Sequence, residues 1–117
     1  MKYISVLILL LTCIICIGQD CDKLVSTFQS YTNALNTISK TRFKISESAN
    51  TSSSSWIRSA KYFSCGGSTG FLIIEANSQN YIHQNVPFNI WNSFKNSPSF
   101  GQYYNKFIKN RYRLYLK

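Results

Sequence analysis

The chain has 117 residues, of which 44% are hydrophobic and 15% aromatic, and this length leaves room for one small domain rather than several. Thirteen Lys and Arg residues stand against four Asp and Glu residues, giving a formal net charge of +9. This balance excludes an acidic, solvating chain and favours acidic partners such as nucleic acid or another polyanion.

The first 18 residues have the pattern of a secretory signal peptide. Lys2 is followed by an apolar run from Ile4 to Ile17, and the small side chains of Cys16 and Gly18 precede a plausible cleavage point. A membrane-spanning helix needs about 20 apolar residues, whereas this run ends at Gln19 after fewer. We therefore expect export to the periplasm, the cell surface or the medium, with no stable membrane anchor after cleavage.

Two cysteines within the apolar run raise the alternative of a lipoprotein. Cys13 and Cys16 lie near its end, where a lipid-modified cysteine would be placed. The residues before them are Thr12 and Ile15, whereas such a cysteine normally follows Gly, Ala or Ser. Lipidation is therefore the minor alternative.

Cleavage after residue 18 would leave two cysteines in the mature chain, Cys21 and Cys65. In an oxidising compartment two cysteines favour a single disulfide. Cys65 could instead be a nucleophile or a ligand beside His83, the one histidine, although no spacing motif supports that pairing. A free thiol is the other alternative.

Residues 19–45 predict an amphipathic helix followed by a short connector. Asp20 and Asp22 would lie favourably at its positive end. Its polar side has too few Lys or Arg residues for a helix on a membrane surface, so we expect it to cover a core. The apolar side chains recur at steps of four and three, at Leu24, Phe28, Tyr31, Leu35 and Ile38.

Residues 46–55 predict a flexible linker. They end in four serines, and Ala49 is the one apolar residue among them. Such a segment cannot offset its ordering entropy by burial. Alternation between Thr41 and Ile45 is compatible with a short extra strand, but the stretch is too short to assign.

Residues 56–112 predict an α+β domain with three antiparallel strands followed by two helices. Alternating apolar and polar residues predict a strand from Trp56 to Phe63, a more apolar one from Phe71 to Ala76, and a third from Tyr81 to Gln84. The two short connections favour an antiparallel meander.

Val86-Pro87 marks the change from strands to helices, because proline suits the first turn of a helix. The first helix would end at Ser97-Pro98. Ser99 and Gln102 then have the spacing of a capping box for the second. We expect both helices on one side of the sheet and the N-terminal helix packed against this domain, since a module of its size is marginal alone.

The residue spacing in the second helix predicts one apolar side and one basic side. One arc would carry Phe100, Tyr103, Tyr104, Phe107 and Ile108, and the opposite side Lys106, Lys109 and Arg113. No acid follows Glu75, and residues 113–117 form a basic tail. Basic groups supply affinity for phosphates, and aromatic faces can stack on bases.

These residues resemble the KTSC domain family from about residue 54 to residue 112. The family is named from the C-terminal extension of some lysyl-tRNA synthetases and also occurs as small stand-alone proteins. The resemblance is carried in order by Ser54-Ser55-x-Ile57 with Tyr62, Leu72-x-Ile74, Tyr81, Val86-Pro87, Ser99-x-Gly101-x-Tyr103-Tyr104-Asn105 and Ile108-Lys109-Asn110-Arg111-Tyr112.

The resemblance implies a domain of unknown function, with RNA binding suggested by its association with a tRNA synthetase. Three departures from the family pattern stand out. The family's central Tyr-x-Tyr is Tyr81-Ile82-His83 here, which adds a titratable group. Asn110 replaces the loop glycine before the final Arg-x-Tyr, and the spacer from Cys65 to Gly70 is rich in glycine.

A non-enzymatic binding module for nucleic acid or another polyanion is our first functional hypothesis. Its candidate binding residues are Tyr81, His83, Lys106, Lys109, Arg111 and Arg113. An envelope protein-protein interaction module is the second hypothesis. A small secreted nuclease-like toxin is the third, because acid-base catalysis needs a positioned pair of groups and His83 has only Glu75, Cys65 and tyrosines as conceivable partners. We expect no cofactor or metal.

Overall fold

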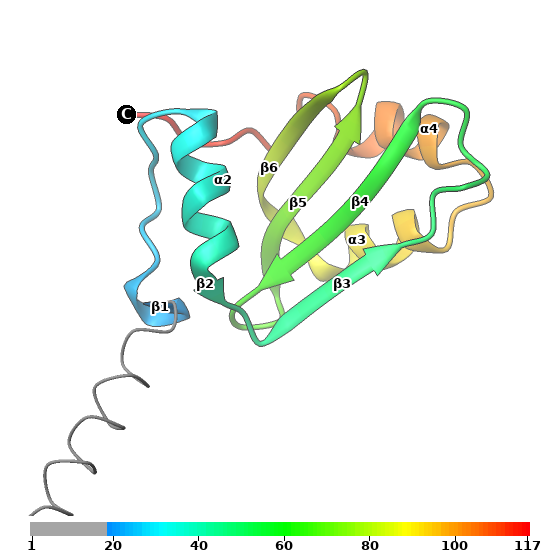
Figure 1. Cartoon of the computed structure of the whole chain (residues 1–117). Coiled ribbons are helices and arrows are strands. Elements are labelled where there is room, and N and C mark those ends of the chain that lie inside the picture. Colours follow the sequence, from blue (N-terminus) through cyan, green and yellow to red (C-terminus); the bar gives the residue numbers. More distant parts are fainter. Residues whose placement is uncertain (1–18) are drawn as a thin grey trace, which may run out of the picture.

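The computed structural model describes residues 19–117, and the expected signal peptide lies outside this range. A four-stranded antiparallel sheet forms the centre of the α+β fold (Figure 1). Its strands follow one another in the order β3 (Ile45–Ala49), β4 (Ile57–Ser64), β5 (Thr69–Ala76) and β6 (Gln79–Pro87). The helices are α2 (Tyr31–Lys40), α3 (Phe88–Lys95) and α4 (Phe100–Tyr103), the last continuing into a π-helical turn, η2 (Tyr104–Ile108).

The two C-terminal helices lie on one face of the sheet, as predicted, and α2 covers the opposite face, which the sequence did not specify (Figure 1). On one face Leu72 and Tyr62 pack with Trp91 of α3 and with the aromatic residues of α4 and η2. On the other face Phe71 and Ile82 pack with Ala34, Ile38 and Phe28. The sheet is therefore buried on both sides, which gives this small chain two apolar clusters instead of one.

The predicted linker is wrong in its first half, because Ile45–Ala49 is strand β3. The strand pairs with β4 from Ile45 opposite Ser64 to Ala49 opposite Ala60. Ile45, Glu47 and Ala49 face inward. The Glu47 carboxylate accepts hydrogen bonds from Trp91 and Lys95 of α3. The polar composition of β3 is typical of an edge strand. Backbone hydrogen bonds to β4 stabilise it, although few of its side chains are apolar.

The predicted N-terminal helix is wrong in extent, since the helix begins only at Tyr31. Ser30 caps it by accepting a hydrogen bond from the Asn33 N–H, 3.1 Å away. The residues before it form β1 (Gln19–Asp20), which pairs in parallel with β2 (Thr41–Arg42), and the short 3₁₀ turn η1 (Cys21–Lys23). Phe28 keeps an extended backbone because its N–H and C=O bond the C-terminal segment.

The C-terminal residues 113–117, which the sequence marks as a basic tail, pack against the fold. The Phe28 N–H donates to the Tyr115 carbonyl, and the Lys117 N–H donates to the Phe28 carbonyl, at 2.9 and 2.8 Å. The buried Gln84 side chain of β6 accepts from the Tyr115 N–H and donates to the Ser26 carbonyl. Leu114 is buried in the cluster around Phe28.

Pro87 and Ser99 set the starts of the two C-terminal helices. Strand β6 runs through to Pro87, which is also the N-cap of α3, so the helix itself begins at Phe88. Ser99 Oγ accepts from the Gln102 N–H, as the capping box predicts. In a capping box the Gln102 side chain would accept from the Ser99 N–H, but here this N–H donates to Ser97 Oγ instead.

Asn110 adopts a left-handed conformation, with φ of 65°, directly after η2 and Lys109. Replacing Asn110 by Ala should lower the free energy of unfolding by about 1 kcal/mol, because a Cβ without a compensating amide disfavours this conformation. Urea denaturation measures the change. Asn110→Gly is the matched control and should cost less than about 0.5 kcal/mol; a larger cost for glycine than for alanine would show that the backbone angle is not what the site requires.

Candidate functional site

A cleft of about 400 Å³ runs along the outer edge of β6, and we call it the β6 cleft. Among the described strands β6 pairs only with β5, so its other edge faces side chains from η2 and the C-terminal segment. The volume lies within the range of small-molecule sites. The walls combine aromatic rings, amides and two cations, including Trp56, Tyr81, Tyr104, Asn105, Lys109 and Arg113, with Tyr31, His83 and Leu116 completing them.

Trp56 forms one wall of the β6 cleft, and the local structure holds its ring there. Ser54 Oγ accepts the backbone N–H groups of Trp56 and Ile57, at 3.4 and 3.0 Å, which fixes the entry into β4. The Trp56 ring meets Tyr104 edge-on at 5.9 Å. Gly101 allows this approach, because a Cβ at that position would lie 2.5 Å from the indole nitrogen.

His83 is one of the residues that line the β6 cleft, and its ring is buried with both nitrogens hydrogen-bonded. Nδ1 is 3.0 Å from the Tyr112 carbonyl, and Nε2 is 2.9 Å from the Tyr104 hydroxyl. A carbonyl can only accept, so in the neutral ring Nδ1 carries the proton and Nε2 accepts from the Tyr104 O–H. The imidazole thus ties β6 to η2 and to the segment that carries Arg113.

Burial keeps both partners of this hydrogen bond uncharged at neutral pH. It lowers the pKa of His83 below its ordinary value, an effect that the Tyr112 carbonyl partly opposes. Burial also raises the pKa of Tyr104 to about 12, with smaller contributions from the nearby hydroxyls of Tyr81 and Tyr31. Tyr104 therefore keeps its phenol proton at neutral pH. His83 and Tyr104 form a hydrogen bond between two neutral groups.

Lys109 and Arg113 are the charged residues that line the β6 cleft. Lys109 directly follows η2, and Arg113 follows the turn at Asn110, so this turn brings both to the same site. Both side chains are exposed, and neither forms an ion pair with any residue between 19 and 117. The cleft therefore carries two uncompensated positive charges beside aromatic rings.

The structure divides the six predicted binding residues into two groups. Tyr81, His83, Lys109 and Arg113 meet at the β6 cleft, whereas Lys106 and Arg111 are absent from its lining. Lys106 instead lies with Nζ 5.3 Å from the centre of the Phe107 ring. The expected basic stripe is broken because the helix ends at Ile108, so helical spacing no longer applies to Arg113.

Two further walls of the cleft, Trp56 and Tyr31, are not predicted by the sequence pattern. Trp56 reads as a strand residue, and Tyr31 comes from α2, which covers the other face of the sheet. The helical period assigns Tyr104 to the apolar side of the second helix. Its position beside Asn105 in the Tyr-Tyr-Asn motif is the signal that could have identified it as a cleft residue. No local pattern predicts the position of Tyr31, because it depends on how α2 docks.

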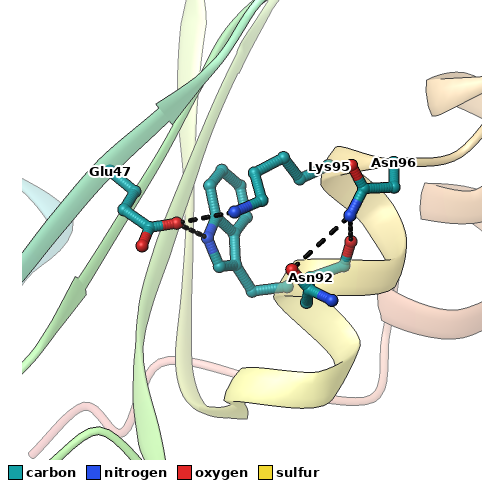
Figure 2. Close-up of polar contacts among 5 residues, drawn as sticks. Glu47, Asn92, Lys95 and Asn96 are labelled. Carbon is teal, nitrogen blue, oxygen red and sulfur yellow. Dashed lines mark hydrogen bonds and ion pairs between the residues drawn. The ribbon is translucent and has the colours of Figure 1, made fainter.

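A second polar cluster joins Glu47 of β3 to Trp91 and Lys95 of α3 (Figure 2). One carboxylate oxygen accepts from the indole N–H and from Lys95 Nζ, each at 2.9 Å. These bonds, first that of Trp91 and then that of Lys95, lower the pKa of Glu47. All three groups satisfy one another, so this cluster holds the edge strand rather than offering a ligand site.

Cys21 and Cys65 form a disulfide, with Cα atoms 5.6 Å apart. The bridge confirms the predicted pairing and overturns the alternative in which Cys65 acts beside His83 as a nucleophile or ligand. Within residues 19–117, no group of three or more His, Cys, Asp or Glu side chains could hold a metal ion.

A family model, the KTSC domain, matches residues 53–112, which is about half of the chain and includes most of the β6 cleft. The chain belongs to the KTSC domain family. No curated protein and no solved structure matches it. Tyr31, Arg113 and Leu116 lie outside the matched KTSC segment, so this chain completes the cleft with residues from both of its flanking segments.

Proposed function

We propose that this protein is an exported, non-enzymatic KTSC-domain module that binds an anionic polymer, single-stranded nucleic acid in the first place, through the β6 cleft. The observation that carries the proposal is the meeting of Lys109 and Arg113 with the rings of Trp56 and Tyr81 in a cleft without a carboxylate among its described walls. Phosphates would contact the two cations, and a base would stack on an aromatic ring.

Export is supported by the N-terminal signal pattern and by the disulfide. A disulfide persists in oxidising compartments and is rare in the cytosol. Between residues 19 and 117 no helix is long and apolar enough to cross a membrane. The partner is therefore sought outside the cytoplasm, as a nucleic acid or another acidic polymer that reaches the protein there.

A non-enzymatic role is supported by the surroundings of His83. Acid-base catalysis needs a group free to exchange protons with a substrate, whereas both nitrogens of this buried ring bond other protein groups. The nuclease-like alternative would need a second acid or base, and the described lining of the β6 cleft holds no carboxylate.

A protein-protein interaction at the cell envelope is the second candidate function, and strand β3 favours it. Among the described strands β3 pairs only with β4, so its outer edge offers backbone groups for pairing with another chain. Glu47 and Lys95, bonded at 2.9 Å, hold this strand against the domain.

Fluorescence anisotropy with a labelled oligothymidylate tests the proposed function. The mature protein should bind it at about 50 mM salt and lose most of this affinity at about 200 mM. Lys109→Ala/Arg113→Ala should weaken binding about tenfold and reduce the salt slope by roughly 0.7 for each phosphate that is no longer neutralised. Tyr81→Ala should weaken binding because stacking on its ring, worth about 1–3 kcal/mol, is removed.

Lys106→Ala/Arg111→Ala is the matched control, since it removes the same charge from outside the β6 cleft. It should weaken binding less than the cleft variant does. Equal losses in the two double variants would mean that net charge alone binds the polymer and that the cleft is not the site. Absence of binding at low salt would remove the proposal and leave the envelope interaction in front.

A further inference from the structure

We propose that His83 couples anion binding in the β6 cleft to the uptake of one proton, and that this proton reverses the hydrogen bond between His83 and Tyr104. The inference rests on the proposed anion-binding function and adds its regulation. It starts from geometry: the ring is buried, its Nδ1 faces the Tyr112 carbonyl at 3.0 Å and its Nε2 faces the Tyr104 hydroxyl at 2.9 Å.

The neutral arrangement fixes what the Tyr104 hydroxyl offers to the cleft. Its proton is donated to His83 Nε2, so only oxygen lone pairs remain for other partners. Lone pairs suit a hydrogen-bond donor and repel an anion. In this state the hydroxyl of Tyr104, which lines the cleft, works against the two cations that also line it, Lys109 and Arg113.

Protonation of His83 inverts this arrangement. Nδ1–H keeps its bond to the Tyr112 carbonyl, and the new Nε2–H must donate to the Tyr104 oxygen, which forces the phenol proton to turn away. The freed O–H can then donate to an anion in the cleft. One proton therefore adds a positive charge and converts the hydroxyl from an acceptor to a donor.

The groups around the ring show why the empty cleft resists this proton. Across the strand pair His83 faces the apolar Leu72 of β5, which offers no compensating charge. The titratable or charged groups that share the cleft are the phenols of Tyr104, Tyr81 and Tyr31 and the cations Lys109 and Arg113. Burial disfavours the imidazolium, whereas an anion placed beside Lys109 and Arg113 would compensate for its charge.

Linkage fixes the sign of the effect. If the bound anion raises the proton affinity of His83, then the proton must raise the anion affinity of the cleft by the same factor. Affinity should therefore increase as the pH falls through the range where the empty form is neutral and the bound form is protonated. The upper limit for one proton is about tenfold per pH unit.

Binding of an oligothymidylate without terminal phosphates measures the coupling, because its phosphodiesters do not titrate in this range. At constant ionic strength the affinity of the mature protein should rise at least about threefold between about pH 7.0 and about pH 5.5. In His83→Gln, whose side chain cannot take up the proton, the ratio of the two affinities should fall toward one, whatever the absolute affinity.

A second measurement uses the wild-type protein and does not depend on a folded variant. The chain has one histidine, so its ring resonance follows His83 directly in an NMR pH titration. Its pKa should be higher with the saturating oligothymidylate than without it. In Tyr104→Phe, checked for native circular dichroism, the pH-dependent gain in affinity should shrink, because the acceptor of the new Nε2–H is missing.

The outcomes separate the coupling from the function on which it rests. Binding that is independent of pH, together with an unchanged His83 pKa, would overturn the coupling and leave the proposed binding function intact. A pH-dependent gain that persists in His83→Gln would also overturn it. No binding at low salt at either pH would overturn both.

Discussion

Removal of the Cys21–Cys65 disulfide is expected to lower the free energy of unfolding by about 4 kcal/mol in the loop-entropy model, the largest effect of any change to covalent structure here. The bridge joins residues 44 positions apart, and so it removes many conformations from the unfolded chain. It also ties the extended N-terminal segment to the turn between β4 and β5.

Urea denaturation of the mature protein and of Cys21→Ser/Cys65→Ser measures this change. Reductant should reduce the stability of the wild type and leave the double variant unchanged, which serves as the control for other effects of the reagent. A decrease below about 1 kcal/mol would mean that packing around Phe28 already restrains the segment and that the bridge adds little. Because Cys21 lies outside the matched family segment, the β6 cleft should keep its walls from residues 53–112.

Replacement of Trp91 by Ala is expected to lower the free energy of unfolding by about 3–5 kcal/mol. The indole is fully buried, stacks on Tyr62 with ring centres 5.4 Å apart, and packs against Phe94 at 5.9 Å. Its N–H also donates to Glu47 of the edge strand. The variant thus loses apolar burial, leaves a cavity and removes one of two donors from a carboxylate.

Two comparison variants separate the contribution of ring burial at Trp91 from that of its hydrogen bond to Glu47. Phe107→Ala removes an aromatic ring that is 37% exposed and should cost less than about 1 kcal/mol. Trp91→Phe keeps part of the ring packing but loses the bond to Glu47. Its cost in free energy of unfolding should lie between those of Phe107→Ala and Trp91→Ala. Thermal or urea unfolding of the three variants gives the order, and a cost for Trp91→Ala as small as that for Phe107→Ala would contradict the assigned core.

Much of the KTSC segment could be predicted from local pattern. The alternation in Ile57–Ser64 and Thr69–Ala76 marks two strands correctly, and the third is longer than predicted, at Gln79–Pro87. Pro87 and Ser99 predict where the last two helices start, because their backbone and hydroxyl chemistry acts over a few residues.

The incorrect predictions have a common cause, which is that distant residues decide these elements. Residues 46–49 are polar enough to be predicted as linker, yet they belong to β3 because β4 supplies the hydrogen bonds of this strand and Trp91 and Lys95 bind Glu47. Phe28 fits a helical period, yet its backbone pairs with the C-terminal segment. Neither competing interaction can be found in a short window of sequence.

The sequence by itself determined the family, the antiparallel meander from β4 to β6, the starts of the last two helices, the cysteine pair and the excess of basic residues near the C-terminus. Each depends on residue types, local periodicity or composition, and these are properties of the chain before it folds. Only the tertiary structure decided that the sheet is covered on both faces, that Lys109 and Arg113 reach the cleft while Lys106 and Arg111 do not, and that His83 bonds Tyr104. The ends of η2 and β6 set these positions, because a side chain's neighbours across a fold depend on where helices stop and how the elements pack.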